Sequence, residues 1–438
     1  MHNQVAGVVI LGGGLTGIAT ALHLKKPWRL FEREPRLGGL AVTRTKNGYA
    51  FDRTGHWLHL RDQGMKDLVA EVLPGQMSRV ERRARIYSHG VTTLYPFQAN
   101  LHGLPAEVVK ECLLGVIEAK LAPPGEGEPK NFEEYCLRHF GPGISKHFMI
   151  PYNERLWGVS PREITAAWCS RFVPLPNLEQ VVAGAVGADA GALGYNATFA
   201  YPKAGGIESL SAALAGRLDP TRVHTSASLE RVDYRRRQIV VGGETIPYSE
   251  LVSTLPLPEL LKRIVDLPPA IAAHATRLRC TSLRYLDLAT RRAPSADWHW
   301  VYVPEGKFPF YRVGIFSNAA QSMAPPGAGS FYVELAARGE VDEGAVRASV
   351  AGLVEIGAIA SPADVLFADP REIDYAYVVF DEHYYAATSA IFSFLGSHAI
   401  YSRGRYGSWT YNSMEDSLLL GREVATAIDA ETPRSQTP

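Results

Sequence analysis

The stretch Val8-Val9-Ile10-Leu11-Gly12-Gly13-Gly14-Leu15-Thr16-Gly17 decides the fold of this 438-residue chain. Its first four residues predict a short strand, and the glycines that follow predict a turn. Residues 18–24 have helical apolar spacing, and residues 28–31, Trp-Arg-Leu-Phe, predict a second strand. Strand, helix and strand within about 25 residues form the βαβ pattern that opens a Rossmann-type unit.

The glycines of this turn have the spacing GxGxxG. The first permits the tight turn, the second lets the backbone approach a pyrophosphate, and the third lets helix and strand pack closely. The helix N-terminus adds free N–H groups and the positive end of the helix dipole. An acidic residue ends the second strand 20 residues after the first glycine, where a carboxylate binds ribose hydroxyls. The predicted dinucleotide site is Gly12, Gly14, Leu15, Thr16, Gly17 and Glu32. The alternative is a structural turn beside a surface glutamate.

Composition limits the class of protein. The length and an apolar content of 46% suggest two or three folding units. Lysine plus arginine and aspartate plus glutamate both number 45, so the net charge is zero. A general nucleic-acid binder needs a positive field over its surface, and this balance argues against one. Local basic sites for a phosphorylated ligand remain open.

The cysteines and the chain ends predict a cytoplasmic protein without a metal site. The cysteines lack the paired spacing of a zinc site and are expected to be reduced thiols. They are Cys112, Cys136, Cys169 and Cys280. Residues 1–4 lack a basic leader pattern, and no apolar run approaches the ~20 residues of a membrane span. The polar residues 431–438 predict a flexible tail.

Two further stretches narrow the choice of dinucleotide. Gly38-Gly39-Leu40 closely follows the acidic residue, and Val252-Ser253-Thr254-Leu255-Pro256 predicts a later strand. Both resemble the large family of FAD enzymes that includes amine oxidases and protoporphyrinogen oxidase. The resemblance implies FAD as the cofactor, with Gly38, Gly39 and Leu40 beside it. No second GxGxxG is present, so a separate NADPH domain is not expected.

The order of predicted elements gives the fold class. We expect an α/β protein in which a Rossmann-type FAD-binding domain carries an inserted helical domain and a mixed or antiparallel substrate-binding sheet. Helical spacing dominates residues 104–168, and aromatic and β-branched strands dominate residues 280–385. The expected boundaries are 1–93, 203–270 and 395–430 for the FAD-binding domain, 94–202 for the helical substrate-binding domain, 271–394 for the sheet domain and 431–438 for the tail.

Five motifs lie far apart in the sequence. They are Phe51-Asp52-Arg53-Thr54-Gly55-His56-Trp57, Tyr95-Pro96-Phe97-Gln98-Ala99-Asn100, Phe148-Met149-Ile150-Pro151-Tyr152-Asn153 with Trp157 and Trp168-Cys169-Ser170-Arg171, Phe310-Tyr311-Arg312, and Ile400 to Trp409 with Tyr411. Together they resemble the UDP-galactopyranose mutases, particularly those of the eukaryotic type. The resemblance spans nearly the whole chain, from Val8 to about Gly421.

The resemblance implies which residues contact the flavin. Gly55 and His56 are expected near flavin N5, Arg405 beside the ring, and Ser417 among the cofactor contacts. The last helix would point its N-terminus at the flavin and favour an anionic reduced form. Two departures from the family pattern stand out: Thr54 replaces a glycine, and the stretch before Ser417 is about two residues shorter.

The same resemblance implies a nucleotide-sugar site. Aromatic faces would stack on uracil while the Gln98 amide selects it, and Arg171 and Arg312 would grip the diphosphate through two-pronged hydrogen bonds. The residues expected to bind substrate are Tyr95, Phe97, Gln98, Phe148, Tyr152, Asn153, Trp157, Arg171, Asn196, Trp300, Tyr302, Arg312, Tyr385 and Tyr411. Those expected in catalysis are His56, Arg171, Arg312 and Arg405. Taken singly, the aromatic residues could be core residues, His56 a packed loop histidine and Arg312 a surface salt bridge.

The reaction implied by the resemblance is an isomerisation. Such mutases interconvert the pyranose and furanose forms of UDP-galactose with no net redox change, yet they need reduced FAD. N5 of the flavin attacks the anomeric carbon, UDP leaves, and the sugar ring opens and recloses while it is bound to N5. The implied partner is a UDP-sugar, with no nucleic acid and no metal. An external reductant such as NADPH and a homo-oligomer remain open.

Three other functions compete with this prediction. An FAD-dependent oxidoreductase of the amine-oxidase type would share the glycine pattern and the strand at 252–256, but would not need paired arginines. A mutase-like enzyme acting on another nucleotide sugar would keep most of the motifs. A flavin-binding protein without catalysis is the non-enzymatic alternative.

Overall fold

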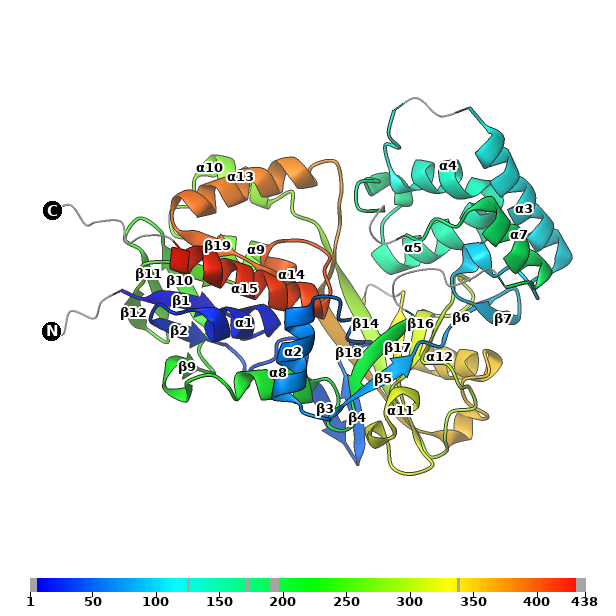
Figure 1. Cartoon of the computed structure of the whole chain (residues 1–438), viewed down its shortest axis with the longest axis horizontal. Coiled ribbons are helices and arrows are strands. Elements are labelled where there is room, and N and C mark those ends of the chain that lie inside the picture. Colours follow the sequence, from blue (N-terminus) through cyan, green and yellow to red (C-terminus); the bar gives the residue numbers. More distant parts are fainter. Residues whose placement is uncertain (1–5, 124–126, 170–172, 190–196, 337–338, 431–438) are drawn as a thin grey trace.

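The computed structural model describes residues 6–123, 127–169, 173–189, 197–336 and 339–430. Figure 1 shows three parts: a parallel sheet with helices around it, a group of helices that we call the helical part, and a larger mixed sheet. The α/β class predicted from the sequence is confirmed.

The parallel sheet contains the βαβ unit predicted from the sequence. Its order is β19-β13-β1-β2-β9. The strands are β1 (Val8–Leu11), β2 (Trp28–Phe31), β9 (Val223–His224), β13 (Leu251–Ser253) and β19 (Ile400–Ser402). Helix α1 (Leu15–His23) follows β1 and contacts the last helix, α15 (Met414–Ala430). Gly421 permits this contact, because a Cβ there would lie 2.5 Å from the carbonyl oxygen of Thr16.

The helical part lies where helical spacing predicted it. Its main helices are α3 (Ala106–Leu121), α4 (Phe132–Ile144), α5 (Ile150–Trp157) and α7 (Leu178–Val186), with the π-helix η2 (Ser145–Met149) between α4 and α5. Helix α4 is kinked at Gly141, whose φ of 71° is left-handed, and Pro142 follows directly. The kink and the missing side chain bring α4 close to α3.

The larger sheet is mixed, as predicted. Its order is β18-β14-β17-β16-β15-β6-β7, and its one parallel pair in the described chain is β6 with β15. The strands are β6 (Ala84–Ser88), β7 (Val91–Leu94), β14 (Cys280–Thr290), β15 (Trp300–Tyr302), β16 (Phe310–Ile315), β17 (Gly329–Leu335) and β18 (Val365–Val378). The flanking helix α12 (Glu343–Glu355) contributes Leu353 to the core cluster on this sheet.

The other elements connect these parts. They are β3 (Thr43–Lys46), β4 (Tyr49–Asp52), α2 (Gln63–Val72), β5 (Met77–Glu81), η1 (Phe97–Ala99), η3 (Pro161–Glu163), β8 (Thr198–Pro202), α8 (Glu208–Ala215), η4 (Pro220–Arg222), β10 (Leu229–Asp233), β11 (Gln238–Val241), β12 (Glu244–Pro247), α9 (Leu257–Leu261), α10 (Pro269–Ala275), α11 (Phe316–Ala319), η5 (Gln321–Met323), η6 (Pro362–Asp364), α13 (Tyr384–Ser397) and α14 (Gly404–Gly407).

Two of the expected domain boundaries need correction. Strands β6 and β7 fall within or beside the segment 1–93 assigned to the FAD-binding domain, but they pair in the seven-stranded sheet. Helix α13 falls mostly within 271–394, yet it contacts α10 and β19 beside the parallel sheet. Local patterns could not reveal either assignment, because both depend on pairing between distant segments. We therefore propose three domains, with β6 and β7 in the sheet domain and α13 in the FAD-binding domain.

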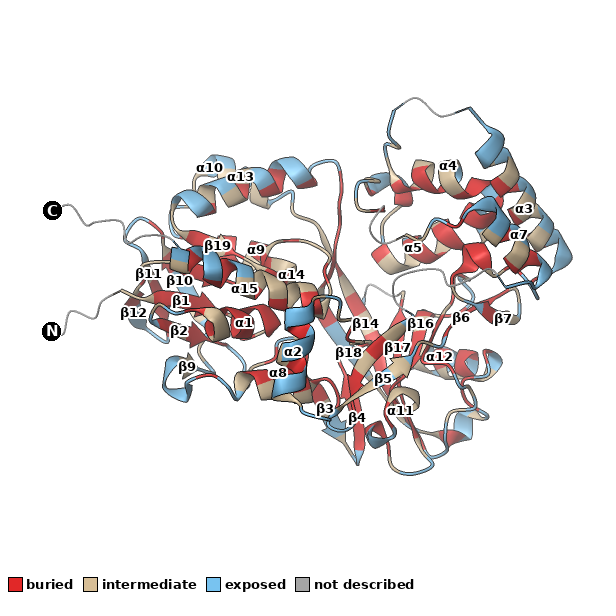
Figure 2. Cartoon of the chain, in the orientation of Figure 1, coloured by how far each residue is buried: buried red, intermediate tan, exposed pale blue. Residues whose placement is uncertain are grey.

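Burial follows this architecture. Figure 2 shows the strands of both large sheets as mostly buried and the outer faces of α3, α10 and α13 as exposed. Cys112, Cys136 and Cys169 are buried, Cys280 is partly buried, and all are free thiols. Within the described ranges, no helix combines the length and apolar character needed to traverse a bilayer.

Candidate active site

A cavity of about 1270 Å³ runs from the glycine turn to the seven-stranded sheet. Its walls include the residues that follow β1, β2, β13 and β19, namely Gly12, Glu32, Thr254 and Arg405. The carboxyl ends of parallel strands form the usual ligand crevice of an open α/β sheet. Sites for one small ligand measure about 300–1,000 Å³, so this volume accommodates a dinucleotide together with a second ligand.

The glycine turn has the form that a dinucleotide requires. Gly12 has a φ of 95°, which glycine adopts readily, and Gly14 forms a bridge with Gly38. A Cβ at Gly17 would overlap the carbonyl oxygen of Gly12, so any side chain there would push α1 away from β1. The cradle and the adjacent helix N-terminus fit the pyrophosphate of FAD.

Glu32 is held rigidly at the end of β2. Its Oε2 accepts a hydrogen bond from the N–H of Gly13 at 2.6 Å, and its Oε1 accepts one from Glu34 at 2.9 Å. The carboxylate lines the cavity and is largely buried. Because a carboxylate has further acceptor positions, this arrangement leaves room for a ribose hydroxyl.

Two helices begin at the cavity. Thr16 in the first turn of α1 donates a hydrogen bond to the carbonyl oxygen of Ser417 in α15 at 2.9 Å, and both residues line the cavity. The start of α15 is capped: Ser413 Oγ accepts from the N–H of Asp416 at 3.1 Å, and Asp416 accepts from the N–H of Ser413 at 2.9 Å. Both helix dipoles therefore favour negative charge at this end of the cavity.

The loop after β4 brings Gly55 and His56 to the cavity wall. A Cβ on Gly55 would lie 2.6 Å from the hydroxyl of Tyr332, so only glycine fits without displacement. Burial, together with the nearby charges of Arg405 and Arg53, lowers the pKa of His56 to about 4. His56 is therefore a neutral imidazole at pH 7.

The His56 imidazole makes a testable contribution to pH stability. Because its pKa falls from 6.5 to about 4 on folding, the unfolded chain takes up this proton first as the pH drops. The stabilising contribution of the neutral ring is complete above pH 6.5 and is lost towards pH 4. We expect His56→Gln to lose less unfolding free energy than the unaltered protein between pH 7 and pH 5, as measured by urea denaturation. An equal loss in both proteins would contradict this assignment.

Thr54, where the family pattern has glycine, lies in the left-handed region with a φ of 65°. A left-handed backbone costs a residue with a Cβ about 1–2 kcal/mol, and β-branching makes it rarer still. We expect Thr54→Gly to be more stable than Thr54→Ala by about 1 kcal/mol in urea denaturation. At Thr45, an exposed position in strand β3, the order should reverse, since glycine weakens a strand. If glycine and alanine had the same order of stability at both positions, the backbone at Thr54 would not be strained.

Arg405 is one of the cationic side chains on the cavity wall. Its Nη1 donates to the carbonyl oxygen of Asn412 at 2.7 Å and its Nη2 to that of Ala376 at 3.1 Å. The guanidinium carbon lies 4.6 Å from the ring centre of Tyr411. Within the described chain no carboxylate pairs with it, so its full charge faces the cavity.

Arg312 lies at the sheet end of the same cavity. Its Nε and Nη2 donate to the two carboxylate oxygens of Glu334 at 2.9 and 2.7 Å, and Nη2 also donates to the hydroxyl of Tyr377 at 2.9 Å. Burial is the largest single influence and lowers the pKa of Arg312, but Glu334 together with the neighbouring tyrosines raises it, and the net pKa is well above its usual value. Arg312 therefore remains charged.

Aromatic side chains close the cavity beside Arg312. Tyr95, Trp300 and Tyr302 line it, and the rings of Tyr95 and Tyr302 lie 5.1 Å apart. Behind them Tyr152 meets Tyr302 edge-on at 5.3 Å. Tyr152 stacks in turn on Phe148 at 5.3 Å, and Phe148 on Phe97 at 5.1 Å.

A family model described as flavin containing amine oxidoreductase matches residues 15–336. The chain belongs to this family. Its fold is similar to a reduced UDP-galactopyranose mutase, with a TM-score of 0.91 and 27% identity over 97% of this chain and 94% of that one.

Two members of the wider fold show how far the architecture extends. A putative protoporphyrinogen oxidase from Exiguobacterium sp. 255-15 matches with a TM-score of 0.74 and 16% identity, over 97% of this chain and 99% of that one. Cyclohexylamine oxidase from Brevibacterium oxydans IH-35A matches with a TM-score of 0.66 and 15% identity over the same shares. Identities this low show the fold alone.

The structure brings most of the predicted cofactor residues to one cavity. Those that line it are Gly12, Gly14, Leu15, Thr16, Glu32, Gly38, Gly39, Leu40, Gly55, His56, Arg405 and Ser417. Gly17 lies behind the turn, where its role is close packing. Segments some 400 residues apart, from Gly12 to Ser417, thus form one continuous cavity wall.

The predicted substrate residues divide into two groups. Tyr95, Trp300, Tyr302, Arg312 and Tyr411 line the cavity. Phe97, Gln98, Phe148, Tyr152, Asn153 and Trp157 lie behind the wall and are buried. The side-chain amides of Gln98 and Asn153 donate to backbone carbonyl oxygens of Pro174 and Met149, each at 2.8 Å. Arg171 and Asn196 lie outside the described residues.

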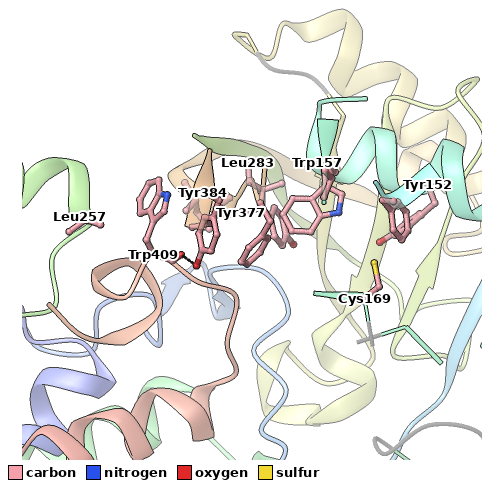
Figure 3. Close-up of a cluster of buried hydrophobic side chains, with 14 of the residues drawn as sticks. Tyr152, Trp157, Cys169, Leu257, Leu283, Tyr377, Tyr384 and Trp409 are labelled. Carbon is pink, nitrogen blue, oxygen red and sulfur yellow. Dashed lines mark hydrogen bonds between the residues drawn. The ribbon is translucent and has the colours of Figure 1, made fainter. Parts of the chain in front are cut away.

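Tyr385 does not reach the cavity. It lies on α13 and is 53% exposed, whereas Tyr377, at the end of β18, lines the cavity and contacts Arg312. Figure 3 shows Tyr377 between Trp157 of the helical part and the region of Tyr384 and Trp409. The sequence Asp374-Tyr375-Ala376-Tyr377 has the alternation that could have identified it. Glu334, in an apolar strand, was also missed.

Proposed function

We propose that this protein is a flavin-dependent mutase that interconverts the pyranose and furanose forms of a UDP-sugar, with UDP-galactose as the first candidate. The observation that carries the proposal is the single cavity that joins the dinucleotide cradle to Arg312, Tyr377 and Arg405. The 27% identity and near-complete overlap with a UDP-galactopyranose mutase support it.

In this proposal the cationic end of the cavity holds the diphosphate. Arg312 and Arg405 supply charge, and the hydroxyls of Tyr377 and Tyr411 supply neutral donors. When the bond between the anomeric carbon and the diphosphate breaks, negative charge grows on the leaving oxygen. Fixed donors that already face this position stabilise the charge without reorganising, which lowers the barrier. Arg171 is proposed as a further diphosphate ligand on the resemblance alone.

Uridine would occupy the aromatic end near Tyr95 and Tyr302. Stacking on aromatic rings contributes about 1–3 kcal/mol per base and tolerates any base. The proposed selection for uracil therefore depends on polar groups, and Gln98 is the candidate. It must exchange its bond to Pro174 for one to the base, with movement of Phe97, Phe148 and Tyr152 behind the wall. Asn153, Trp157 and Asn196 are proposed on the resemblance alone.

FAD would be held by the glycine turn, Glu32, the Gly38-Gly39 pair and the start of α15. When bound and reduced, the flavin supplies a nucleophilic nitrogen to the anomeric carbon of the sugar. The chain's part is to exclude water, orient the sugar and keep His56 neutral, so that His56 accepts or donates a hydrogen bond without adding charge. An external reductant such as NADPH would have to maintain the reduced state.

The main alternative is an amine oxidase, which the family also contains. A primary amine enters such a site either as the neutral base or as an ammonium ion. The cavity presents Arg405 without a described carboxylate partner, and Arg312 already neutralises Glu334. The charge of Arg405 repels a cation and attracts a phosphate, and Glu334 is not available to attract the cation, so the electrostatics around these residues favour the nucleotide sugar. A mutase acting on another UDP-sugar has the same electrostatics and is decided by experiment.

One experiment tests the proposal. Dithionite-reduced protein is mixed with UDP-galactofuranose, and the products are separated by anion-exchange chromatography. We expect UDP-galactopyranose to form with the reduced protein and none with the oxidised protein. If neither UDP-galactofuranose nor other UDP-furanoses are converted, the proposal is wrong. Oxygen consumption with a panel of amines would then favour the oxidase.

A further inference from the structure

Glu334 is the fully buried partner of the cavity arginine. It lies on β17 directly opposite Arg312 on β16, and its side chain has no exposed area. The two form a planar, two-pronged ion pair with distances of 2.9 and 2.7 Å. Glu334 does not line the cavity, so it acts on a ligand only through Arg312.

Burying a carboxylate at this position costs free energy, so its presence calls for a functional reason. Every residue of β17 is buried, and the neighbours of Glu334 along the strand are Val333 and Leu335. An apolar pair at such a site is often as stable as an ion pair or more stable. Stability alone therefore gives no reason for a glutamate here. The benefit lies in the direction that it imposes on the guanidinium.

The ion pair determines which donors remain for a ligand. A guanidinium has five N–H groups. Glu334 takes the Nε hydrogen and one Nη2 hydrogen, and Tyr377 takes the other Nη2 hydrogen. Within the described chain, the two hydrogens on Nη1 have no acceptor. The Tyr377 oxygen already accepts from Arg312, so its own hydrogen is available to donate.

We propose that Glu334 is a positioning residue that fixes Arg312 and, through it, the Tyr377 hydroxyl as a preset pair of donors for the diphosphate of the substrate. This inference rests on the proposed function for the identity of the ligand. A guanidinium without Glu334 would rotate about its side chain, and Tyr377 would lose the bond that directs its hydrogen. Ordering these donors before binding avoids an entropic cost when the ligand arrives.

The test compares three ligands by calorimetry on the flavin-loaded protein: UDP, inorganic pyrophosphate, and uridine, which lacks the diphosphate. Glu334→Gln keeps the shape of the side chain and removes its charge. Glu334→Asp keeps the charge but shortens the side chain by one methylene, which moves the carboxylate away from Arg312. We expect both variants to weaken UDP and pyrophosphate about tenfold, equivalent to one charge-assisted hydrogen bond, and to leave uridine unchanged. Asp287→Asn is the matched control. Asp287 lies in the same seven-stranded sheet as Glu334, is a buried carboxylate paired with an arginine, Arg44, and does not line the cavity.

The outcomes separate this inference from the proposed function. Equal weakening of all three ligands, or of the Asp287→Asn control, would make Glu334 merely structural and overturn the inference. Tighter UDP binding in Glu334→Gln would overturn it too, because the carboxylate would then be only a competing charge. Weaker pyrophosphate binding in both variants, in a protein that does not bind UDP, would support the inference and refute the proposed function. A protein that binds neither anion refutes both.

Discussion

Replacing Arg312 by methionine is expected to lower the free energy of unfolding by about 3–5 kcal/mol, because it leaves Glu334 as an unpaired buried charge. Methionine fills much of the same volume, so the loss measures charge rather than packing. Urea denaturation at a fixed flavin concentration gives the value. Activity should disappear as well, since the variant also lacks the donors of the guanidinium.

A second substitution distinguishes the charge effect from other causes. In the double variant Arg312→Met with Glu334→Leu, the buried charge is gone, and we expect at least half of the lost stability to return. Activity should not return, because neither residue restores a donor in the cavity. If the double variant were as unstable as the single one, the desolvated carboxylate would not be the cause.

Replacing Gly17 by alanine is expected to lower the affinity for flavin by about tenfold or more. The added Cβ overlaps the carbonyl oxygen of Gly12, and this backbone atom cannot move without opening the turn that cradles the pyrophosphate. The flavin-to-protein absorbance ratio after purification, followed by titration with FAD, measures the loss.

The matched control for Gly17 is Gly396. It lies in helix α13 with open space around its Cβ position. Alanine is favoured over glycine in a helix by about 1 kcal/mol, so Gly396→Ala should be slightly more stable and keep its flavin. Flavin loss in both variants would point to general instability, and retention in both would show that the turn tolerates a side chain.

The flavin end of the molecule was predictable because its signals are local. Gly12, Gly14, Gly17 and Glu32 lie within one βαβ unit, whose strand, turn and helix each have their own sequence pattern. The spacing therefore predicted the elements and their order together. The start of α15 depends on an equally local signal, because the capping box of Ser413 and Asp416 spans only four residues.

The sheet end was less predictable because its site depends on pairing. Glu334 faces Arg312 across two strands, and nothing in the sequence near either residue specifies that register. Tyr377 and Tyr385 are both tyrosines near the expected position, but one ends a strand that reaches the cavity and the other starts a helix on the surface. The alternation at 375–377 was the signal that separates them.

Strands β14 and β18 place Leu283 and residues 372–377 on the cavity wall. They have 11 and 14 residues and pair from Cys280 with Val378, beside the cavity, to Thr290 with Val365. Inserting one residue before Tyr377 would turn its ring to the opposite face of the sheet. Inserting two would keep the face and advance the ring by about 6.7 Å. The length of this strand pair thus determines where the Tyr377 ring lies in the cavity. Relatives that handle larger or smaller substrates should differ in the length of these strands by even numbers of residues.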